Sequence, residues 1–211
     1  MRLIDSHCHL EYEGVVEDRS GVLDRARAAG VTGMLNISTR RSEWDSVIGT
    51  AADNSDIWAS VGIHPHEADG HADLGRDALL EAASHPKVIG IGESGLDYYY
   101  DKSDRSVQRD LFRTHIGVAR ETGLPIIIHT RDAEEDTHAI LAEEMGKGAF
   151  PGVIHCFTAS GAFGFALGGV PGTAIGVAGG VDGRIGVVEL GEEPAGVVDG
   201  AGVVDGDGGA G

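Results

Sequence analysis

The sequence predicts an α/β fold, a (β/α)8 barrel of the TIM type. Up to about residue 160, short apolar runs alternate six times with stretches of helical periodicity. Parallel strands need crossover helices of this kind between them. The strongest polar motifs also follow the ends of these apolar runs. In a barrel, the carboxyl ends of the strands converge on one mouth, where the active sites are found.

An open doubly wound sheet is the alternative α/β architecture. It binds ligands at the carboxyl ends of its strands only near the point where the strand order switches. In this chain, five different apolar runs end in or beside a histidine or a glutamate. Contributions from so many strands to one site favour closure, and we therefore expect the barrel.

The predicted strands are short apolar runs that end where polar motifs begin. They cover residues 2–6, 33–38, 58–63, 87–92, 124–129 and 152–155. The clearest helical stripe runs from Val107 to Ala119, with Ser106 as the expected N-cap and Gly123 as the residue that ends the helix. Weaker stripes cover residues 23–27 and 44–51.

The segment from Gly161 to Gly211 differs in composition from the rest. Glycine makes up 18 of its 51 residues, and Arg184 is its single basic residue. Glycine at this density costs too much backbone entropy and supplies few side chains for a core. We therefore expect a partial barrel domain, residues 1–160, and an irregular low-complexity tail, residues 161–211. Because a full barrel needs about 250 residues, the barrel is expected to be truncated after its sixth strand. Our hypothesis is that the reading frame was lost near residue 160.

Composition and charge limit the class of protein. With 211 residues, 41% of them hydrophobic, the chain can bury a core. It shows no start typical of a signal peptide and no apolar run of about 20 residues, so no membrane span is expected. Cys8 and Cys156 each neighbour a histidine within a strand and are expected to be small buried side chains. This usage favours a reducing cytoplasm.

The formal charge of −18 bears on possible partners. A non-specific binder of nucleic acid carries a basic surface. If this acidic chain acts on a phosphodiester, bound cations and a few arginines must supply the positive field locally.

The most informative local feature is the pair His7 and His9, at the end of the first predicted strand. Alternate residues of a strand share a face, so the two imidazoles point the same way, roughly 7 Å apart at their backbones. Two such imidazoles suit a divalent transition metal. Glu93, His129 and His155 end other strands in the same manner. A lone histidine is more often a surface or structural residue, but the combination predicts a metal site.

Five motifs carry a wider resemblance. They are Asp5-Ser6-His7-Cys8-His9, Gly62-Ile63-His64-Pro65-His66, Gly92-Glu93-Ser94-Gly95-Leu96-Asp97-Tyr98-Tyr99, His129-Thr130-Arg131-Asp132-Ala133 and His155-Cys156-Phe157-Thr158. With these motifs, in this order over residues 1 to about 160, the chain resembles the TatD-type metal-dependent deoxyribonuclease family of amidohydrolase-like barrels. The C-terminal part of the chain does not match.

The resemblance implies a hydrolase that uses two divalent metal ions. His7, His9 and Glu93 would hold one ion, and Glu93, His129 and His155 the other, so that Glu93 bridges them. Two ions about 3.5–4 Å apart would activate a water and clamp the phosphate oxygens. Magnesium or manganese suits the mixed ligand set, while zinc competes for the imidazoles. The expected substrate is DNA or a small phosphodiester, with no membrane and no obligate protein partner.

One feature of the family is missing. A late aspartate in a Glu-Thr-Asp-x-Pro setting normally completes the site and accepts the proton of the attacking water. Asp205 and Asp207 lie near that place by count, but neither is assigned the role, and the catalytic residue stays unknown. Two alternatives are therefore open: a related barrel hydrolase that acts on small esters or amides, and an inactive metal-binding fragment.

Other polar residues near the mouth have weaker assignments. His64 is a candidate substrate-binding residue, and His66 is expected in a loop. The tyrosines at 98–100 either offer a stacking surface for a base or pack within their loop. Arg131 either contacts a phosphate or pairs with an acid. The remaining histidines are expected to face solvent or to pack: His71, His85, His115 and His138.

Overall fold

The computed structural model describes residues 3–155 and 174–177 of the chain. Within these residues, seven strands form one sheet in the order β1-β2-β3-β4-β5-β6-β7, and each neighbouring pair is parallel. The strands are β1 (Leu3–Cys8), β2 (Val31–Asn36), β3 (Ile57–Val61), β4 (Val88–Asp97), β5 (Ile126–Arg131), β6 (Pro151–Ile154) and β7 (Ala174–Val177).

Helices connect the first six strands. The α-helices of the described residues are α1 (Arg19–Ala28), α2 (Trp44–Asp53), α3 (Arg76–Ala83), α4 (Arg105–Thr122) and α5 (Glu134–Met145). Short 3-10 turns, η1 (Val16–Asp18), η2 (Arg41–Glu43), η3 (Pro65–Glu67) and η4 (Asp69–His71), lie in the connections.

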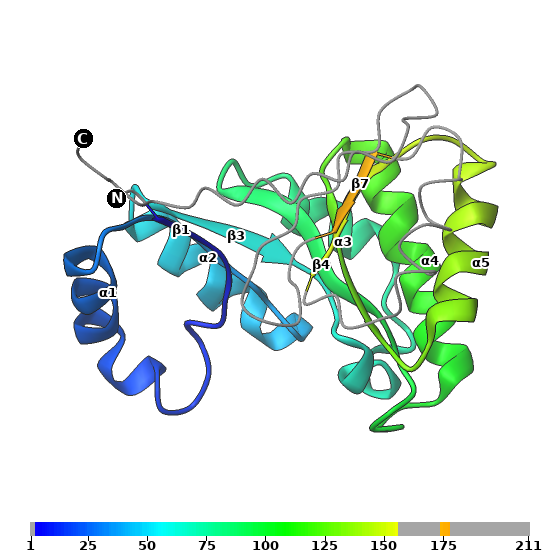
Figure 1. The fold of residues 1–211 in the computed structure, drawn as a ribbon, viewed down its shortest axis with the longest axis horizontal. Coiled ribbons are helices and arrows are strands. Elements are labelled where there is room, and N and C mark those ends of the chain that lie inside the picture. The colour runs from blue at the N-terminus through cyan, green and yellow to red at the C-terminus, as the bar shows by residue number, and fades with distance from the viewer. Residues whose placement is uncertain (1–2, 156–173, 178–211) are drawn as a thin grey trace, which may run out of the picture.

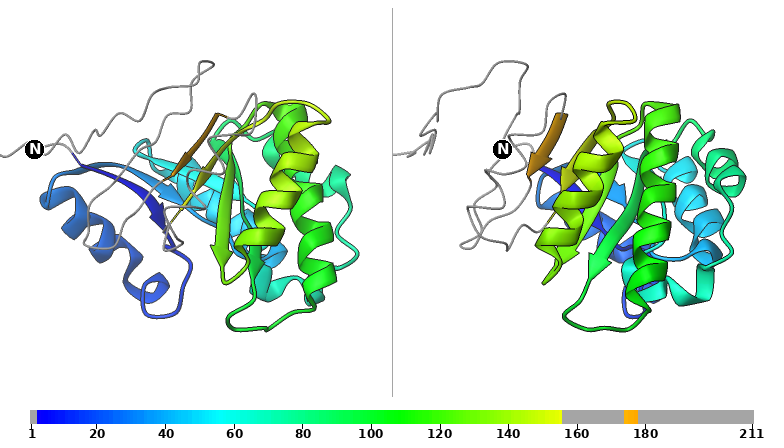
Figure 2. Two further views of the ribbon diagram at one scale, coloured as in Figure 1. Left: turned by 45° about the vertical axis from the view of Figure 1, so that its right-hand side comes forward. Right: turned by 90° about the vertical axis from the view of Figure 1, so that its right-hand side faces the viewer.

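The strand order confirms the predicted fold class. The strands follow one another in the sheet in the same order as in the chain, without the reversal that marks a doubly wound sheet. The helices follow one another around the outside of the curved sheet (Figures 1 and 2). This is the arrangement of a partial (β/α) barrel.

All six predicted strands are present, with shifted ends. The largest shift is in β4, which continues to Asp97 instead of ending at residue 92. Similarly, β5 continues to Arg131, beyond the predicted end at residue 129. Glu93 and His129 therefore lie within strands. His129 pairs with Gly95, and Glu93 stands at the register irregularity between the paired residues Gly92 and Ser94.

The seventh strand was not predicted. Residues 174–177 lie in the glycine-rich segment that we expected to be irregular, yet their backbone pairs in parallel with all four residues of β6. Parallel pairing uses only backbone N–H and C=O groups, so a segment with few large side chains can still extend a sheet. The described sheet therefore extends one strand beyond the predicted sixth strand, and the rest of the tail lies outside the described residues.

Helix α4 shows how the sequence pattern produces the core. Its residues Leu111, Phe112, Ile116 and Ala119 are buried, as the helical stripe predicts. Gly123 ends the helix in the left-handed conformation, with φ of 71°.

The predicted N-cap of this helix is wrong. The cap is Asp104, whose side chain accepts hydrogen bonds from the backbone N–H groups of Ser106, at 2.7 Å, and Val107, at 3.3 Å. Ser106 lies within the first turn, where its own N–H needs a partner. An aspartate at this position also interacts favourably with the helix dipole.

His115 on α4 is a fully buried packing residue, as expected. Its Nδ1–H donates to the carbonyl of Leu111 at 2.7 Å, and its Nε2 accepts from the backbone N–H of Ile63 at 3.0 Å. This bond ties α4 to the segment immediately before His64. Burial lowers the pKa of His115 to about 4.

Replacing His115 with Leu is expected to lower stability at neutral pH and to remove part of its pH dependence. The N–H of Ile63 would lose its buried acceptor, at a cost of about 1–3 kcal/mol. In the wild type, the unfolded chain takes up a proton at His115 near its ordinary pKa of 6.5, while the folded chain does so only near 4. The stability that neutral His115 contributes is therefore complete above pH 6.5, the pKa in the unfolded chain. It is lost as the pH falls towards about 4, the pKa in the folded chain.

Urea denaturation at several pH values between these limits tests this prediction. The variant His115→Leu should lose less stability on acidification than the wild type. His138→Leu on α5 is a matched control that should keep the wild-type pH profile. Identical profiles for His115→Leu and the wild type would refute the prediction.

Candidate metal centre

The five residues predicted as metal ligands come together around the carboxylate of Glu93. One oxygen, Oε2, faces β1, with His7 Nε2 at 3.3 Å and His9 Nε2 at 4.0 Å. The other oxygen, Oε1, faces β5 and β6, with His129 Nδ1 at 2.9 Å and His155 Nε2 at 2.5 Å. Each carboxylate oxygen thus faces at least two imidazoles, which is the arrangement expected of a bridging ligand, and a third ring, that of His64, lies 3.6 Å from Oε1.

Parallel pairing explains why residues so distant in sequence meet. Glu93 extends from β4, and the register places Gly95 opposite His129 on β5. His155 follows β6, and its backbone N–H donates to the carbonyl of Ile128 on β5 at 3.1 Å. His7 lies on β1, at the other side of the sheet. Curvature of the sheet brings these carboxyl ends towards one mouth.

Glu93 is the buried anion of the cluster, with 3% of its side chain exposed. Burial raises the pKa of this carboxyl, but hydrogen bonds with His129 and His155 lower it more, so the pKa lies well below its ordinary value. A carboxylate that remains ionised among several imidazoles is a strong attractant for cations.

Backbone and carboxylate partners set the orientation of two of the imidazoles. His9 Nδ1 lies 3.2 Å from the carbonyl of Ile37, which can only accept, so Nδ1 carries the proton and Nε2 presents its lone pair towards Glu93. His129 Nε2 lies 3.1 Å from Asp97 Oδ2, which leaves Nδ1 for the Glu93 side. Partners of this kind fix the tautomer of metal-binding histidines.

His64 lies at the mouth, but its tautomer differs from that of a ligand. Its Nδ1 accepts a hydrogen bond from the backbone N–H of His66 at 3.1 Å, so the proton of the neutral ring is on Nε2. That Nε2–H is 3.6 Å from Glu93 Oε1. Burial lowers the pKa of His64 to about 3, so the ring is neutral at physiological pH. A neutral donor at this place suits contact with a substrate oxygen better than metal binding.

The donor set fits divalent cations. Among the described residues, both ring nitrogens of His7 are buried without a hydrogen-bond partner, an unfavourable state that a bound cation would relieve at one of them. The ligand atoms of His7, His9 and Glu93 lie within 4.8 Å of one another, as do those of His64, Glu93 and His129. The second group contains His64 in the place where the sequence predicted His155. Because His64 carries its proton on the Nε2 that faces Glu93, His155 is the better candidate ligand.

Asp97 and His66 belong to the site and were not predicted. Asp97 is buried, and its Oδ2 accepts from His66 Nε2 at 2.8 Å as well as from His129. Its Oδ1 accepts from the backbone N–H groups of Tyr99, at 3.1 Å, and Tyr100, at 2.9 Å. The sequence did contain a signal for Asp97, which lies four residues after Glu93. Side chains at an even spacing share one face of a strand, but the predicted strand ended before Asp97.

The cysteine next to the ligands is not a nucleophile. Cys8 donates to the carbonyl of Leu35 at 3.3 Å, and burial together with the charge of Asp5 raises its pKa to about 12. The side chain of Cys8 is partly buried, whereas the sequence predicted a buried one. Cys156, Asp205 and Asp207 lie outside the described residues.

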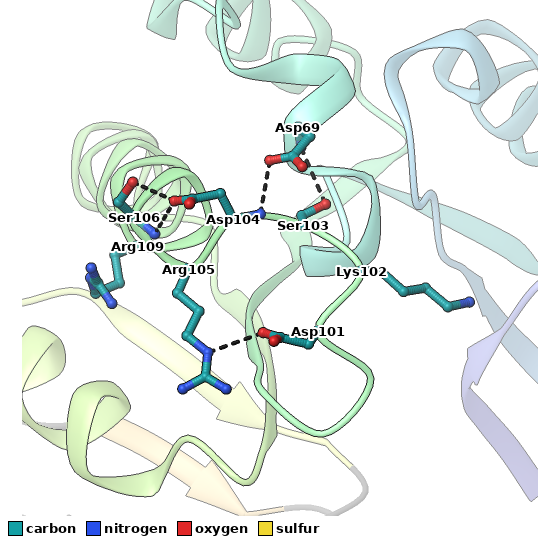
Figure 3. A pocket seen from close by; sticks show the side chains of 8 residues that line it. All are labelled: Asp69, Asp101, Lys102, Ser103, Asp104, Arg105, Ser106 and Arg109. Carbon is teal, nitrogen blue, oxygen red and sulfur yellow. Dashed lines mark hydrogen bonds and ion pairs between the residues drawn. The ribbon is translucent and has the colours of Figure 1, made fainter.

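A surface hollow of about 540 Å³ lies beside the start of α4. Its charged groups largely pair with their neighbours, as Arg105 does with Asp101 at 3.0 Å and Asp104 with Ser106 (Figure 3). The hollow contains none of the predicted ligands. Within the described residues, no helix has the length and apolar character needed to cross a membrane.

The fold and the site together define a barrel protein with a candidate two-cation centre at its mouth. The family model for TatD related DNase matches residues 4–180, and the chain belongs to this family. The match extends past the limit of about residue 160 set from the motifs, and it includes β7.

Individual relatives agree with this assignment. YabD of Bacillus subtilis (strain 168), named an uncharacterized metal-dependent hydrolase, is 39% identical over 158 residues, covering 75% of this chain and 62% of that protein. The protein of Salmonella typhimurium named 3'-5' ssDNA/RNA exonuclease TatD is 33% identical over 159 residues, covering 75% of this chain and 60% of that protein. The chain therefore spans about three fifths of the length of these curated relatives.

A solved structure has the same fold. The crystal structure of YJJV, a TatD homologue from Escherichia coli K12, matches with a TM-score of 0.73 at 27% sequence identity, covering 83% of this chain and 67% of that chain.

Proposed function

We propose that this protein is a divalent-metal-dependent deoxyribonuclease that cleaves phosphodiester bonds of single-stranded DNA in the cytoplasm. The observation that carries the proposal is the division of the imidazoles between the two oxygens of Glu93. Membership of the TatD related DNase family supports it, as does the name of the Salmonella relative.

The geometry around Glu93 supports the following ligand assignment. His7, His9 and Glu93 would hold one cation, and Glu93, His129 and His155 the second. Bound cations supply Lewis acidity, which lowers the pKa of water and neutralises the charge on a phosphate. Magnesium, manganese and zinc are the candidate ions, because the set combines carboxylate oxygens with imidazole nitrogens.

The chain's own residues bind and orient the substrate. The Nε2–H of His64 is placed to donate to a phosphate oxygen, since the ring is neutral and its Nδ1 is occupied. Glu93 stays ionised and keeps the centre attractive to cations. Asp97 is unsuited to take a proton from the attacking water, because four hydrogen bonds already occupy its two oxygens.

Release of nucleotides from single-stranded DNA in the presence of Mg²⁺ or Mn²⁺ is the expected activity. Excess EDTA should abolish it, and adding back the divalent ion should restore it, because the site residues then regain their cations. The measurement is separation of labelled products by gel electrophoresis, with metal content determined on the same sample.

A small carboxylic ester and a small phosphodiester serve as parallel substrates. Robust turnover of the carboxylic ester without nucleotide release would overturn the nuclease assignment in favour of a related barrel hydrolase. Stoichiometric metal without any hydrolysis would instead identify a metal-binding protein that lacks catalysis.

A further inference from the structure

An exposed group of aromatic and cationic side chains lies beside the metal centre. We call Tyr99, Tyr100, Lys102 and Arg131 the cation–tyrosine cluster. The guanidinium of Arg131 lies over both rings, 4.1 Å from the centroid of Tyr99 and 4.8 Å from that of Tyr100. Lys102 Nζ lies 5.7 Å from the centroid of Tyr100. Cations over aromatic rings are attracted by the negative ring faces.

The strands of the metal centre also hold this cluster. Asp97 on β4 is paired in register with Arg131 on β5, and the backbone N–H of Tyr98 donates to the carbonyl of Arg131 at 2.9 Å. Asp97 Oδ1 accepts from the N–H groups of Tyr99 and Tyr100. The same carboxylate that orients His129 therefore fixes the backbone of both tyrosines, which makes the cluster a preformed surface.

The cluster is continuous with the metal centre. The rings of Tyr100 and His66 are 5.3 Å apart between centroids and nearly perpendicular, at 84°. His66 in turn contacts Asp97 at 2.8 Å, and the rings of His66 and His129 are 6.3 Å apart. His66 therefore links the ring of His129 at the metal centre to the ring of Tyr100 in the cluster.

Within the part of the chain that the structure describes, Lys102 and Arg131 form no ion pair. No carboxylate of the described residues lies within the 4.0 Å ion-pair distance of Lys102 or Arg131. Asp101, the residue before Lys102, pairs with Arg105 instead, and Figure 3 shows the side chain of Lys102 extending away from that pair. In a protein with a formal charge of −18, two unpaired cations at the mouth provide the local positive field that an anionic substrate needs.

Packing within the loop does not account for the tyrosines. Tyr99 and Tyr100 are 56% and 50% exposed. Their neighbour Tyr98 shows the packed alternative, because it is partly buried and its hydroxyl donates to Asp136 at 2.5 Å. The loop thus uses Tyr98 for packing and leaves two aromatic side chains at the surface.

We propose that the cation–tyrosine cluster binds the nucleotide next to the cleaved bond of a single-stranded nucleic acid. A base stacks on the exposed tyrosines, while Arg131 and Lys102 hold the adjoining phosphate. Stacked guanidinium groups keep their N–H donors free at the edge, where a phosphate can bind. The identification of the ligand as nucleic acid rests on the proposed function. Nucleic acid carries both a flat base and a phosphate, the two groups that the cluster would bind. Stacking and charge without base-edge contacts give binding with little sequence preference.

Binding without cleavage tests the cluster directly. The probe is a short fluorescein-labelled oligothymidylate with phosphorothioate linkages, titrated with the full chain in Mg²⁺ and followed by fluorescence anisotropy. Tyr100→Leu is expected to weaken binding by about 5- to 100-fold, the effect of losing one base stack. Tyr100→Phe should retain the wild-type affinity. An abasic strand of equal length should bind Tyr100→Leu and the wild type equally well.

Arg131→Gln tests the phosphate contact. It should weaken binding of both strands and reduce the salt dependence of log Kd by about 0.7, the contribution of one phosphate contact to a single strand. Arg25→Gln is the matched control, because Arg25 is exposed on α1, with 67% of its side chain accessible. It should change neither the affinity nor the salt dependence.

The outcomes separate this proposal from the proposed function. If the wild type releases nucleotides while Tyr100→Leu and Arg131→Gln bind like the wild type, the nucleotide-binding role of the cluster is refuted. The proposed nuclease activity is then unaffected. If the variants lose affinity as stated and no nucleotide is released, the cluster is a nucleic-acid subsite and the nuclease assignment fails. Equal weakening of both strands by Tyr100→Leu would also refute base stacking.

Discussion

Replacing Glu93 with Gln is expected to abolish hydrolysis and to remove bound metal. Both carboxylate oxygens face pairs of imidazoles, so the amide would lose the negative charge and would turn a nitrogen towards one pair. Loss of several kcal/mol of charge stabilisation corresponds to a fall in kcat of at least about 10³-fold. Metal content by plasma mass spectrometry should drop along with the rate.

Glu143→Gln is the matched control for this prediction. Glu143 lies on α5, is none of the candidate ligands, and pairs at the surface with Lys147 at 2.8 Å and Arg113 at 2.9 Å. The control should keep the metal and the activity of the wild type. Circular dichroism should give wild-type helix content for both variants, since Gln matches Glu in volume. Full metal occupancy in Glu93→Gln would show that Glu93 is not a ligand.

The sequence predicted which side chains meet around Glu93 better than it predicted the ends of the strands. His7 and His9 could be placed on one face because the side-chain period of a strand is two. Glu93, His129 and His155 could be placed at the same mouth because the ends of parallel strands in a barrel converge. Both arguments depend on the existence and direction of the strands, and neither needs their exact bounds.

Asp97 and His66 could not be found by the same arguments. The prediction ended the fourth strand at residue 92, before Ser94 and Gly95, so Asp97 fell beyond the predicted strand. Its side chain reaches the site because β4 continues, paired with β5, through a segment that propensity alone assigns to a turn. His66 follows a proline and was read as a loop residue, but the turn η3 directs its ring to Asp97. In both cases, contacts between residues distant in the sequence bring the side chain to the site.

Gly95→Ala is expected to be the most destabilising single-methyl substitution near the site. Gly95 has φ of +146°, which side chains other than that of glycine rarely adopt. A Cβ at this position would lie 2.0 Å from the carbonyl oxygen of His129 and 3.1 Å from its carbonyl carbon. These are backbone atoms of the paired strand, so no side-chain rotation can relieve the clash.

The strain must therefore be relieved by separating β5 from β4. Strain of the backbone and overpacking each cost about 1–3 kcal/mol, so the free energy of unfolding should fall by about 2–6 kcal/mol. The displaced strand carries His129, and the metal affinity should fall as well, because the distance of 2.9 Å between His129 and Glu93 depends on this pairing. Urea denaturation and metal titration of the same variant measure the two effects.

Gly49→Ala supplies the matched control, since an added Cβ there meets no atom within 4 Å and Gly49 lies within helix α2. That substitution should leave metal binding intact and raise stability by up to about 1 kcal/mol, because alanine favours the helix over glycine. If Gly95→Ala unfolded at the same urea concentration as the wild type, the close approach of β4 to β5 at His129 would be wrong. The position of His129 beside Glu93 would then lose its structural basis.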